Sequence, residues 1–131
     1  MNPRLITASN LVAALDLEPH VEGGFFRRTY QADHRDMLET EGGQRFLMTS
    51  IYYLLTAESP VGQFHFNQSD ILHYFHLASR LLNGENGFGL ISEAVSSGFD
   101  FADMEIGNRR KLTTQYPQHR ALIEMLTRDE D

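Results

Sequence analysis

The sequence predicts a mainly β domain with one helix near its start and two short helices near its end. Aromatic and β-branched runs bounded by turn residues predict strands through the middle of the chain. Helical spacing of apolar residues occurs only towards the two ends. The chain has 131 residues, 41% of them apolar and 22% charged. This length and composition predict a single domain over residues 1–131 with a core of its own.

The helices are predicted from their caps and their apolar faces. Residues 7–17 form the first, which Thr7 or Ser9 can cap and which Pro19 prevents from continuing. Residues 108–115 and 117–127 form the other two, and Pro117 suits a first helical turn. All three helices are short, so packing against the rest of the domain must stabilise them.

The strands are predicted at residues 25–30, 46–55 and 87–95, with a short extended piece that ends at Ile106. Both alternating faces of residues 46–55 are apolar, which indicates a strand covered on both sides, as in a sandwich or barrel. We expect residues 31–45 to be mostly loop and residues 78–86 to form a turn.

Three of the six histidines lie in the stretch 63–76, which is therefore the first candidate for a functional site. Residues 63–66 and 71–77 are predicted to form a hairpin around 67–70. In that hairpin His65 and His73 lie opposite each other, with Cβ atoms roughly 5 Å apart. His76, three residues beyond His73, points to the other face.

Composition excludes several classes of partner and site. The net charge is −7, which disfavours binding to a phosphate backbone, so no nucleic-acid partner is expected. The chain has no cysteine, which excludes disulfides and thiolate metal sites. It contains no apolar run of the roughly 20 residues that a membrane span needs. We expect a cytoplasmic protein without a membrane partner.

Several segments, in the right order, resemble the signatures of a known family. They are residues 17–30 (Leu-Glu-Pro-His-Val-Glu-Gly-Gly-Phe-Phe-Arg-Arg-Thr-Tyr), 49–55, 64–73 and 97–106, followed by Tyr116-Pro117. The chain is identified by them as a member of a small RmlC-like cupin family of uncharacterised function, cupin family five. The resemblance implies a double-stranded β-helix, or jelly roll, and proteins of this kind commonly pair as dimers.

The chain departs from the family pattern near Leu77. Family members have several further strands after the segment that matches His73 and His76, whereas this chain runs almost directly into its next signature. Ser97 also stands where the family commonly has proline. Loss of strands reopens the edges of a barrel. We therefore expect an incomplete barrel that is marginally stable, or a homodimer that completes it, with exchange of strands as one route.

The first candidate chemistry is acid–base catalysis. RmlC-like sugar epimerases use a histidine base and a tyrosine acid, which implies His65 or His73 as base and Tyr52, Tyr53 or Tyr74 as acid. Asp70 is the carboxylate nearest in sequence that can orient a histidine. The alternative is that the tyrosines are packing residues.

Ligand binding is the second candidate. Glu22, Arg27, Ser69, Asp70 and Tyr53 are predicted to contact a small-molecule ligand, although strand alternation allows only one of Arg27 and Arg28 to face a pocket. The alternative interpretation is a tight turn at 69–70 and surface charges at the arginines.

A metal site is the third candidate, and the sequence argues against it. Cupin metal sites use a His-x-His pair, and here the second position is Asn67. No metal or other cofactor is predicted. The leading hypothesis is a small-molecule-binding cupin related to sugar isomerases or epimerases. The rival is a non-catalytic dimeric binding or structural protein that is inactive because barrel strands are missing.

Overall fold

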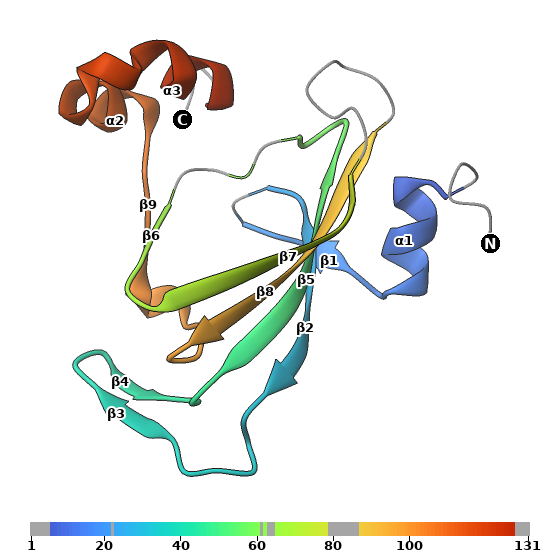
Figure 1. Cartoon of the computed structure of the whole chain (residues 1–131), viewed down its shortest axis with the longest axis vertical. Helices are drawn as coiled ribbons and strands as arrows, with labels where there is room; N and C mark the ends of the chain where they lie inside the picture. The colour runs from blue at the N-terminus through green and yellow to red at the C-terminus, as the bar shows by residue number, and fades with distance from the viewer. Residues whose placement is uncertain (1–5, 22, 61, 63–64, 79–86, 128–131) are drawn as a thin grey trace.

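A computed structural model describes residues 6–127 except 22, 61, 63, 64 and 79–86 (Figure 1). The helices are α1 (Ala8–Ala14), α2 (Arg109–Gln115) and α3 (Arg120–Leu126), with 3-10 turns at Phe101–Asp103 and Pro117–His119. The strands are β1 (Glu18–Pro19), β2 (Phe25–Gln31), β3 (Leu38–Thr40), β4 (Gly43–Arg45), β5 (Thr49–Thr56), β6 (His65–Asn67), β7 (Asp70–Ala78), β8 (Phe88–Ser96) and β9 (Met104–Ile106). None of the helices in this part of the chain is long and apolar enough to cross a membrane.

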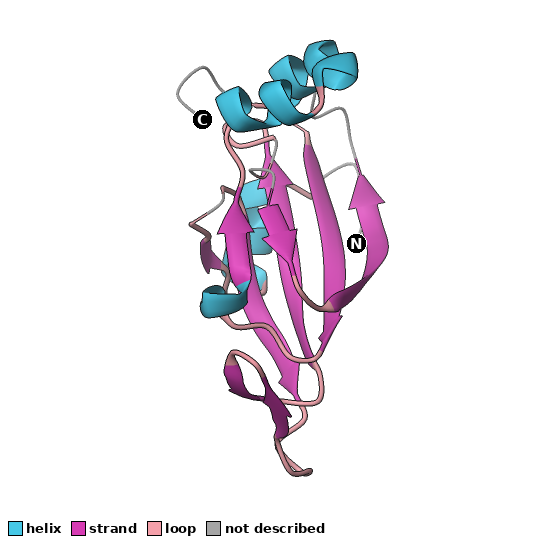
Figure 2. Cartoon of the chain, turned by 90° about the vertical axis from the view of Figure 1, so that its left-hand side faces the viewer, coloured by secondary structure: helices cyan, strands magenta, loops and turns pink. Residues whose placement is uncertain are grey.

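The strands form one antiparallel sheet of five and two small ladders. The order of the sheet is β1-β2-β5-β8-β7, while β3 pairs with β4 and β6 pairs with β9. Figures 1 and 2 show α1 beside the main sheet, and α2 with α3 together at the far end of β9. The predicted mainly β class is confirmed, with one helix before the sheet and two after it.

The core lies between α1 and one face of the main sheet. Leu54 of β5 is fully buried, and Leu17, Phe88 and Leu90 pack around it. The apolar face of α1 covers this cluster, which explains how a helix of only seven residues persists. Thr7 caps α1, accepting a hydrogen bond from the backbone N–H of Asn10 as predicted.

Two boundaries differ from the prediction. Residues 31–45 were expected to be mostly loop, and most of them do lie outside strands, but the prediction missed the short β3–β4 hairpin, which is closed at Gly43 with a φ of 119°. The strand expected from residue 46 begins at Thr49. The carbonyl of Phe46 accepts a hydrogen bond from the backbone N–H of Gly98, which lies in a loop, and so does not pair with a neighbouring strand. The predicted turn at 78–86 falls almost entirely outside the described residues.

The predicted hairpin of the histidine stretch is wrong. β6 pairs with β9, which places His65 opposite Ile106, and β7 pairs with β8, which places His73 opposite Glu93. The turn at 68–69 therefore passes the chain from a small ladder to the main sheet and does not fold two neighbouring strands together. Crossovers of this kind are what close a barrel from two sheets, and sequence proximity does not reveal them. The opposite orientation of His76 is confirmed by its contact with Ser92 on the other face.

The glycine pair before β2 packs against β5. Gly24 has a φ of 75°, and a Cβ placed on it would lie 2.6 Å from the carbonyl oxygen of Leu54. The hydroxyl of Tyr53 donates to the carbonyl of Gly23. This contact requires both a left-handed backbone and the absence of a side chain.

Gly24→Ala is therefore expected to lower the free energy of unfolding by about 1–3 kcal/mol, through backbone strain and the forced separation of the two strands. Urea unfolding followed by circular dichroism measures the change. Gly89→Ala in β8, where φ is not left-handed, is the matched control and should change stability by less. Equal effects at the two positions would contradict this account of Gly24.

Candidate functional site

A small cavity lies between the main sheet, the β6–β9 ladder and the segment 97–103. Its volume is about 60 Å³. The lining side chains come from five strands and two connecting segments, and half of them are polar: His20, Phe26, Arg28, Ser50, Ile51, His65, Asn67, Glu93, Val95, Phe99, Phe101 and Met104. The cavity lies on the face of the sheet opposite α1.

One row of residues across the sheet supplies the charges of the cavity. Arg28 lies opposite Ile51, Ile51 opposite Glu93, and Glu93 opposite His73. Cross-strand partners share a face, so a cation, a carboxylate and an imidazole follow the same line across four strands. Nε2 of His73 lies 3.2 Å from Oε1 of Glu93, and Arg28 donates to the carbonyl of Phe99 at 3.3 Å.

The His73–Glu93 pair is placed at the border between the interior and solvent. The Glu93 side chain is 17% exposed and the His73 side chain 44% exposed. A mostly buried carboxylate needs a charged or hydrogen-bonding partner, which His73 provides. Because His73 is half exposed, its ring is open to solvent while Glu93 orients it.

Asn67 contributes an acceptor that no protein group satisfies. Its Oδ1 is buried and has no hydrogen-bond partner, and its side chain lines the cavity. A buried acceptor left unpaired costs about 1–3 kcal/mol, so native structures rarely retain one without a ligand or water that fills the role. The cavity is therefore suited to a molecule that carries an N–H or O–H donor.

The structure places Arg27 and Tyr52 on the α1 face of the sheet, away from the cavity. Arg27 lies 3.9 Å from Asp16 and donates to the carbonyl of Leu15. The ring of Tyr52 lies 6.0 Å from that of His76. Their predicted grouping with His65 is wrong, because strand alternation directs the next residues along, Arg28 and Tyr53, to the other face.

Ser69 and Asp70 also lie away from the cavity lining. The hydroxyl of Ser69 is 3.3 Å from that of Ser97, in the turn before β7. Asp70 is exposed and opposite Ser96 at the start of that strand. Asp70 is three residues before His73 and points to the opposite face, so Glu93 of the neighbouring strand is the carboxylate beside the imidazole.

Besides His73, two predicted residues lie near the site, and one predicted residue falls outside the described part of the chain. His65 lines the cavity directly. Tyr53 is buried, and its ring lies 5.6 Å from that of the cavity residue His20. Glu22 lies outside the described residues. Within the described part of the chain, no group of three histidine, aspartate or glutamate side chains converges as a metal site would require.

Sequence reasoning missed Glu93, Arg28, His20 and Asn67. Glu93 had a usable signal, because it is the single charged residue within the strand 87–95. A charged side chain in the middle of a buried strand needs a specific partner and often marks a site. The choice between Arg27 and Arg28 could not be made without knowing which face of the sheet α1 covers.

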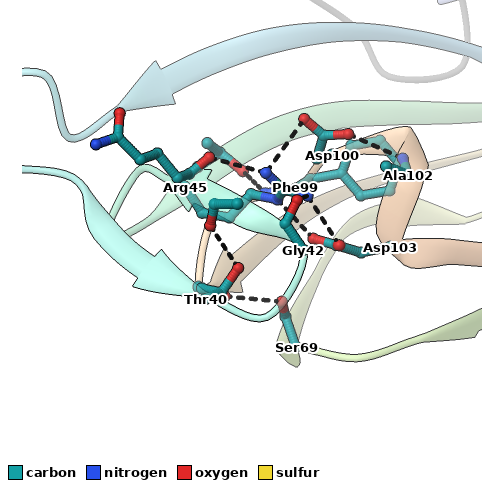
Figure 3. A network of polar contacts seen from close by, with 12 residues as sticks. Thr40, Gly42, Arg45, Ser69, Phe99, Asp100, Ala102 and Asp103 are labelled. Carbon is teal, nitrogen blue, oxygen red and sulfur yellow. Dashed lines mark hydrogen bonds and ion pairs between the residues drawn. The ribbon is translucent and has the colours of Figure 1, made fainter.

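A second polar network stabilises the wall of the cavity (Figure 3). Arg45 is buried and donates to both carboxylate oxygens of Asp103, at 2.7 and 3.0 Å, and to the carbonyl of Gly42. Asp100 lies 3.8 Å away. The hydrogen bond to Asp103 raises the pKa of Arg45, and the same bond lowers the pKa of Asp103. The network ties the β3–β4 hairpin to the segment that carries Phe99 and Phe101.

The cavity is open to solvent at Arg28, His65 and Phe101, which are exposed. Comparisons with known proteins identify the family. The family described as cupin superfamily, DUF985, matches residues 9–82. An uncharacterized protein of Saccharomyces cerevisiae is 31% identical over 144 positions, covering 71% of each chain. The chain belongs to this DUF985 family of cupins, a domain family of unknown function.

Solved structures agree with the assignment. A hypothetical protein from Leishmania major superposes with a TM-score of 0.78 at 25% identity, covering 95% of this chain and 100% of that one. A protein from Shewanella oneidensis gives a TM-score of 0.77 at 29% identity, covering 95% and 99%. Nearly the whole of this chain thus has the arrangement found in these two structures.

The yeast alignment also supports an internal shortening of this chain. It spans 144 positions, whereas 71% of 131 residues is about 93, so about 50 positions of the yeast protein face a gap.

Proposed function

We propose that the protein is a small-molecule-binding cupin whose ligand occupies the cavity between the main sheet and β6–β9. The observation that carries this proposal is the buried, unpartnered Oδ1 of Asn67 in a cavity that also contains Arg28, His65 and Glu93. A preformed cavity with a few convergent polar groups on an apolar lining is the usual form of a ligand site.

The size of the cavity limits what can enter. A volume of about 60 Å³ is far below the roughly 300–1,000 Å³ of pockets that enclose a drug-sized ligand. A carboxylate or hydroxyl-bearing end of a molecule fits the described interior, and the remainder would extend past the half-exposed His73. Arg28 suits a carboxylate or hydroxyl oxygen, and Asn67 suits a hydroxyl hydrogen.

A relation to sugar isomerases is the finer form of the proposal. The bases on the cavity side are His20, His65 and the His73–Glu93 pair, and the ring of buried Tyr53 lies 5.6 Å from that of His20. Proton transfer between a carbon and such a base requires contact within hydrogen-bonding reach of the substrate. Tyr52 would not act in this version, because it lies on the α1 face.

Ligand-observed NMR tests the proposal with small probes: lactate, pyruvate, glycerol, D-ribose and D-glucose. Saturation transfer to at least one of them, with the protein's Asn67 side-chain amide shifted, supports a cavity ligand. No transfer to any of the five probes would contradict it and favour the rival, a non-catalytic binding or structural protein.

Glu93→Gln is expected to raise the Kd of the probe at least about tenfold, because it removes the negative charge that orients His73 and changes the lining of the cavity. Titration of the probe by NMR measures the change. Glu105→Gln is the matched control, since Glu105 is exposed on β9 and does not line the cavity. Unchanged affinity in Glu93→Gln would exclude this cavity as the binding site.

A further inference from the structure

A groove between α2 and the β6–β9 ladder is much larger than the cavity. Its volume is about 880 Å³, within the roughly 300–1,000 Å³ of sites that hold small molecules. The chain passes from β9 into α2 through Gly107 and Asn108, so the ladder forms one wall of the groove and the helix forms the other (Figure 1). The groove is large enough for a whole small molecule, whereas the cavity accepts only one end of it.

Strand alternation separates most of this groove from the cavity. Along β6, His65 and Asn67 line the cavity, and Phe66 between them points to the opposite face of the ladder. Glu105 is the cross-strand partner of Phe66 and shares that face. Phe66 and Glu105 line the groove, while His65 contributes to both spaces and lies at their border. A ligand in the groove therefore does not require a ligand in the cavity.

Large apolar side chains are exposed on both walls of the groove. Phe66 on β6 is 63% exposed and Ile106 on β9 is 38% exposed. Tyr116, at the end of α2, is 48% exposed. A ligand that covers these side chains removes apolar area from water, and apolar side chains exposed together in a groove are a feature of binding sites. Two of the three are aromatic, which favours a planar apolar group as their partner.

Two cations of α2 lie at the same groove and are not neutralised. The side chains of Arg110 and Lys111 are exposed and line the groove. Within the described part of the chain, neither side chain forms an ion pair or a hydrogen bond to another side chain. Glu105 is the one carboxylate of the lining, so the lining is positive although the whole chain carries −7. A positive groove on an acidic protein concentrates anions at that place.

We propose that this groove binds an organic anion with an aromatic body. Its anionic oxygen group lies between Arg110 and Lys111, and its ring lies against Phe66 and Tyr116. A guanidinium donates paired hydrogen bonds to carboxylate or phosphate oxygens, and a lysine ammonium adds a compact charge. The apolar side chains distinguish this ligand from an inorganic anion, and the two cations distinguish it from a neutral aromatic molecule.

A titration followed by two-dimensional amide NMR tests the class of ligand. The probes are phenyl phosphate and benzoate, with inorganic phosphate as the anion without a ring and benzyl alcohol as the ring without a charge. We expect at least one aromatic anion to bind with a Kd at least about tenfold lower than both reference probes, and to shift the backbone amides of Phe66 and Lys111. A reference probe that binds as tightly as both aromatic anions overturns the proposal, and so does the absence of binding by either aromatic anion.

Arg110→Gln and Lys111→Gln test the position of the anionic group. Each should raise the Kd of the tighter aromatic anion at least about tenfold, because one charge-assisted interaction is lost. Arg35→Gln is the matched control, since it removes an exposed arginine that does not line the groove, and it should leave the Kd unchanged. If either variant of α2 binds with the Kd of the wild type, the proposal is overturned.

Phe66→Ala tests the position of the ring. It should remove the preference for the aromatic anion over inorganic phosphate, and a retained preference overturns the proposal. Phe66, Arg110 and Lys111 are exposed, so these variants are expected to give the circular dichroism spectrum of the wild type. The side-chain amide of Asn67 reports on the cavity and should not shift. A shift of Asn67 in place of Phe66 places the anion in the cavity and overturns the proposal, while leaving the proposed cavity ligand intact.

Discussion

Leu54→Ala is expected to lower the free energy of unfolding by about 2–5 kcal/mol. Leu54 is fully buried at the centre of the cluster that joins α1 to the sheet, where Leu17, Phe88 and Leu90 surround it. Removing its side chain leaves a cavity that the neighbouring strands, held in register on both sides, cannot close. The total free energy of unfolding of a domain of this size is roughly 5–15 kcal/mol, so the expected loss is a large fraction of it.

Urea unfolding at fixed protein concentration measures this loss. Leu122→Ala is the matched control, because Leu122 is half exposed on α3. The substitution removes the same atoms as Leu54→Ala, but outside the core. It should cost well under half as much. If both variants lose the same stability, the core is not where the structure places it.

Asp103→Asn is expected to lower Tm by several degrees at pH 7 and to flatten the dependence of Tm on acid pH. The substitution removes the carboxylate that accepts two hydrogen bonds from buried Arg45, and leaves that cation without its closest counter-charge. The β3–β4 hairpin and the segment 97–103 would then separate, and with them one wall of the cavity.

The direction of the pH effect follows from the lowered pKa of Asp103. The hydrogen bond from Arg45 holds the pKa of this carboxyl below its ordinary value near 3.8. Its contribution to stability is therefore complete above that value and is lost as the pH falls through the lowered pKa in the folded protein. Melting curves between pH 2.5 and 7 should show the wild type losing its advantage over Asp103→Asn below about pH 4.

The control for this series is Asp36→Asn, a change at an exposed aspartate. Its Tm should follow the wild type at every pH. An acid profile of Asp103→Asn that parallels the wild type would show that the Arg45–Asp103 pair does not contribute to the pH dependence.

The strands with strong local signals were predictable from sequence. β2, β8 and the helices with their caps Thr7 and Asn108 follow from side-chain periodicity and capping chemistry, which depend on near neighbours. The pairing of β6 was not predictable in this way, because its partner β9 lies about forty residues away. Register between distant strands depends on the closure of the whole barrel.

The candidate site was half predictable for the same reason. His65 and His73 stand out in the sequence, but the groups that give them a chemical setting, Glu93 and Arg28, come from other strands. The alternation of side chains along a strand establishes only that Arg27 and Arg28 face opposite sides of the sheet. Which side is the interior depends on α1, whose packing no local pattern specifies.

The cavity reaches the edge of the main sheet on one side. In the described residues the cavity has walls from β2, β5, β8, β6 and β9, while β7 forms its open border.

The central claim is that this cavity binds a small polar ligand. A crystal structure of the protein soaked with the probe that gives the strongest NMR signal tests it most directly. We predict density for the probe between Arg28 and Glu93, with a donor group within hydrogen-bonding distance of Oδ1 of Asn67. A cavity filled by collapsed Phe99 and Phe101 side chains, or a probe bound only elsewhere, would contradict the claim.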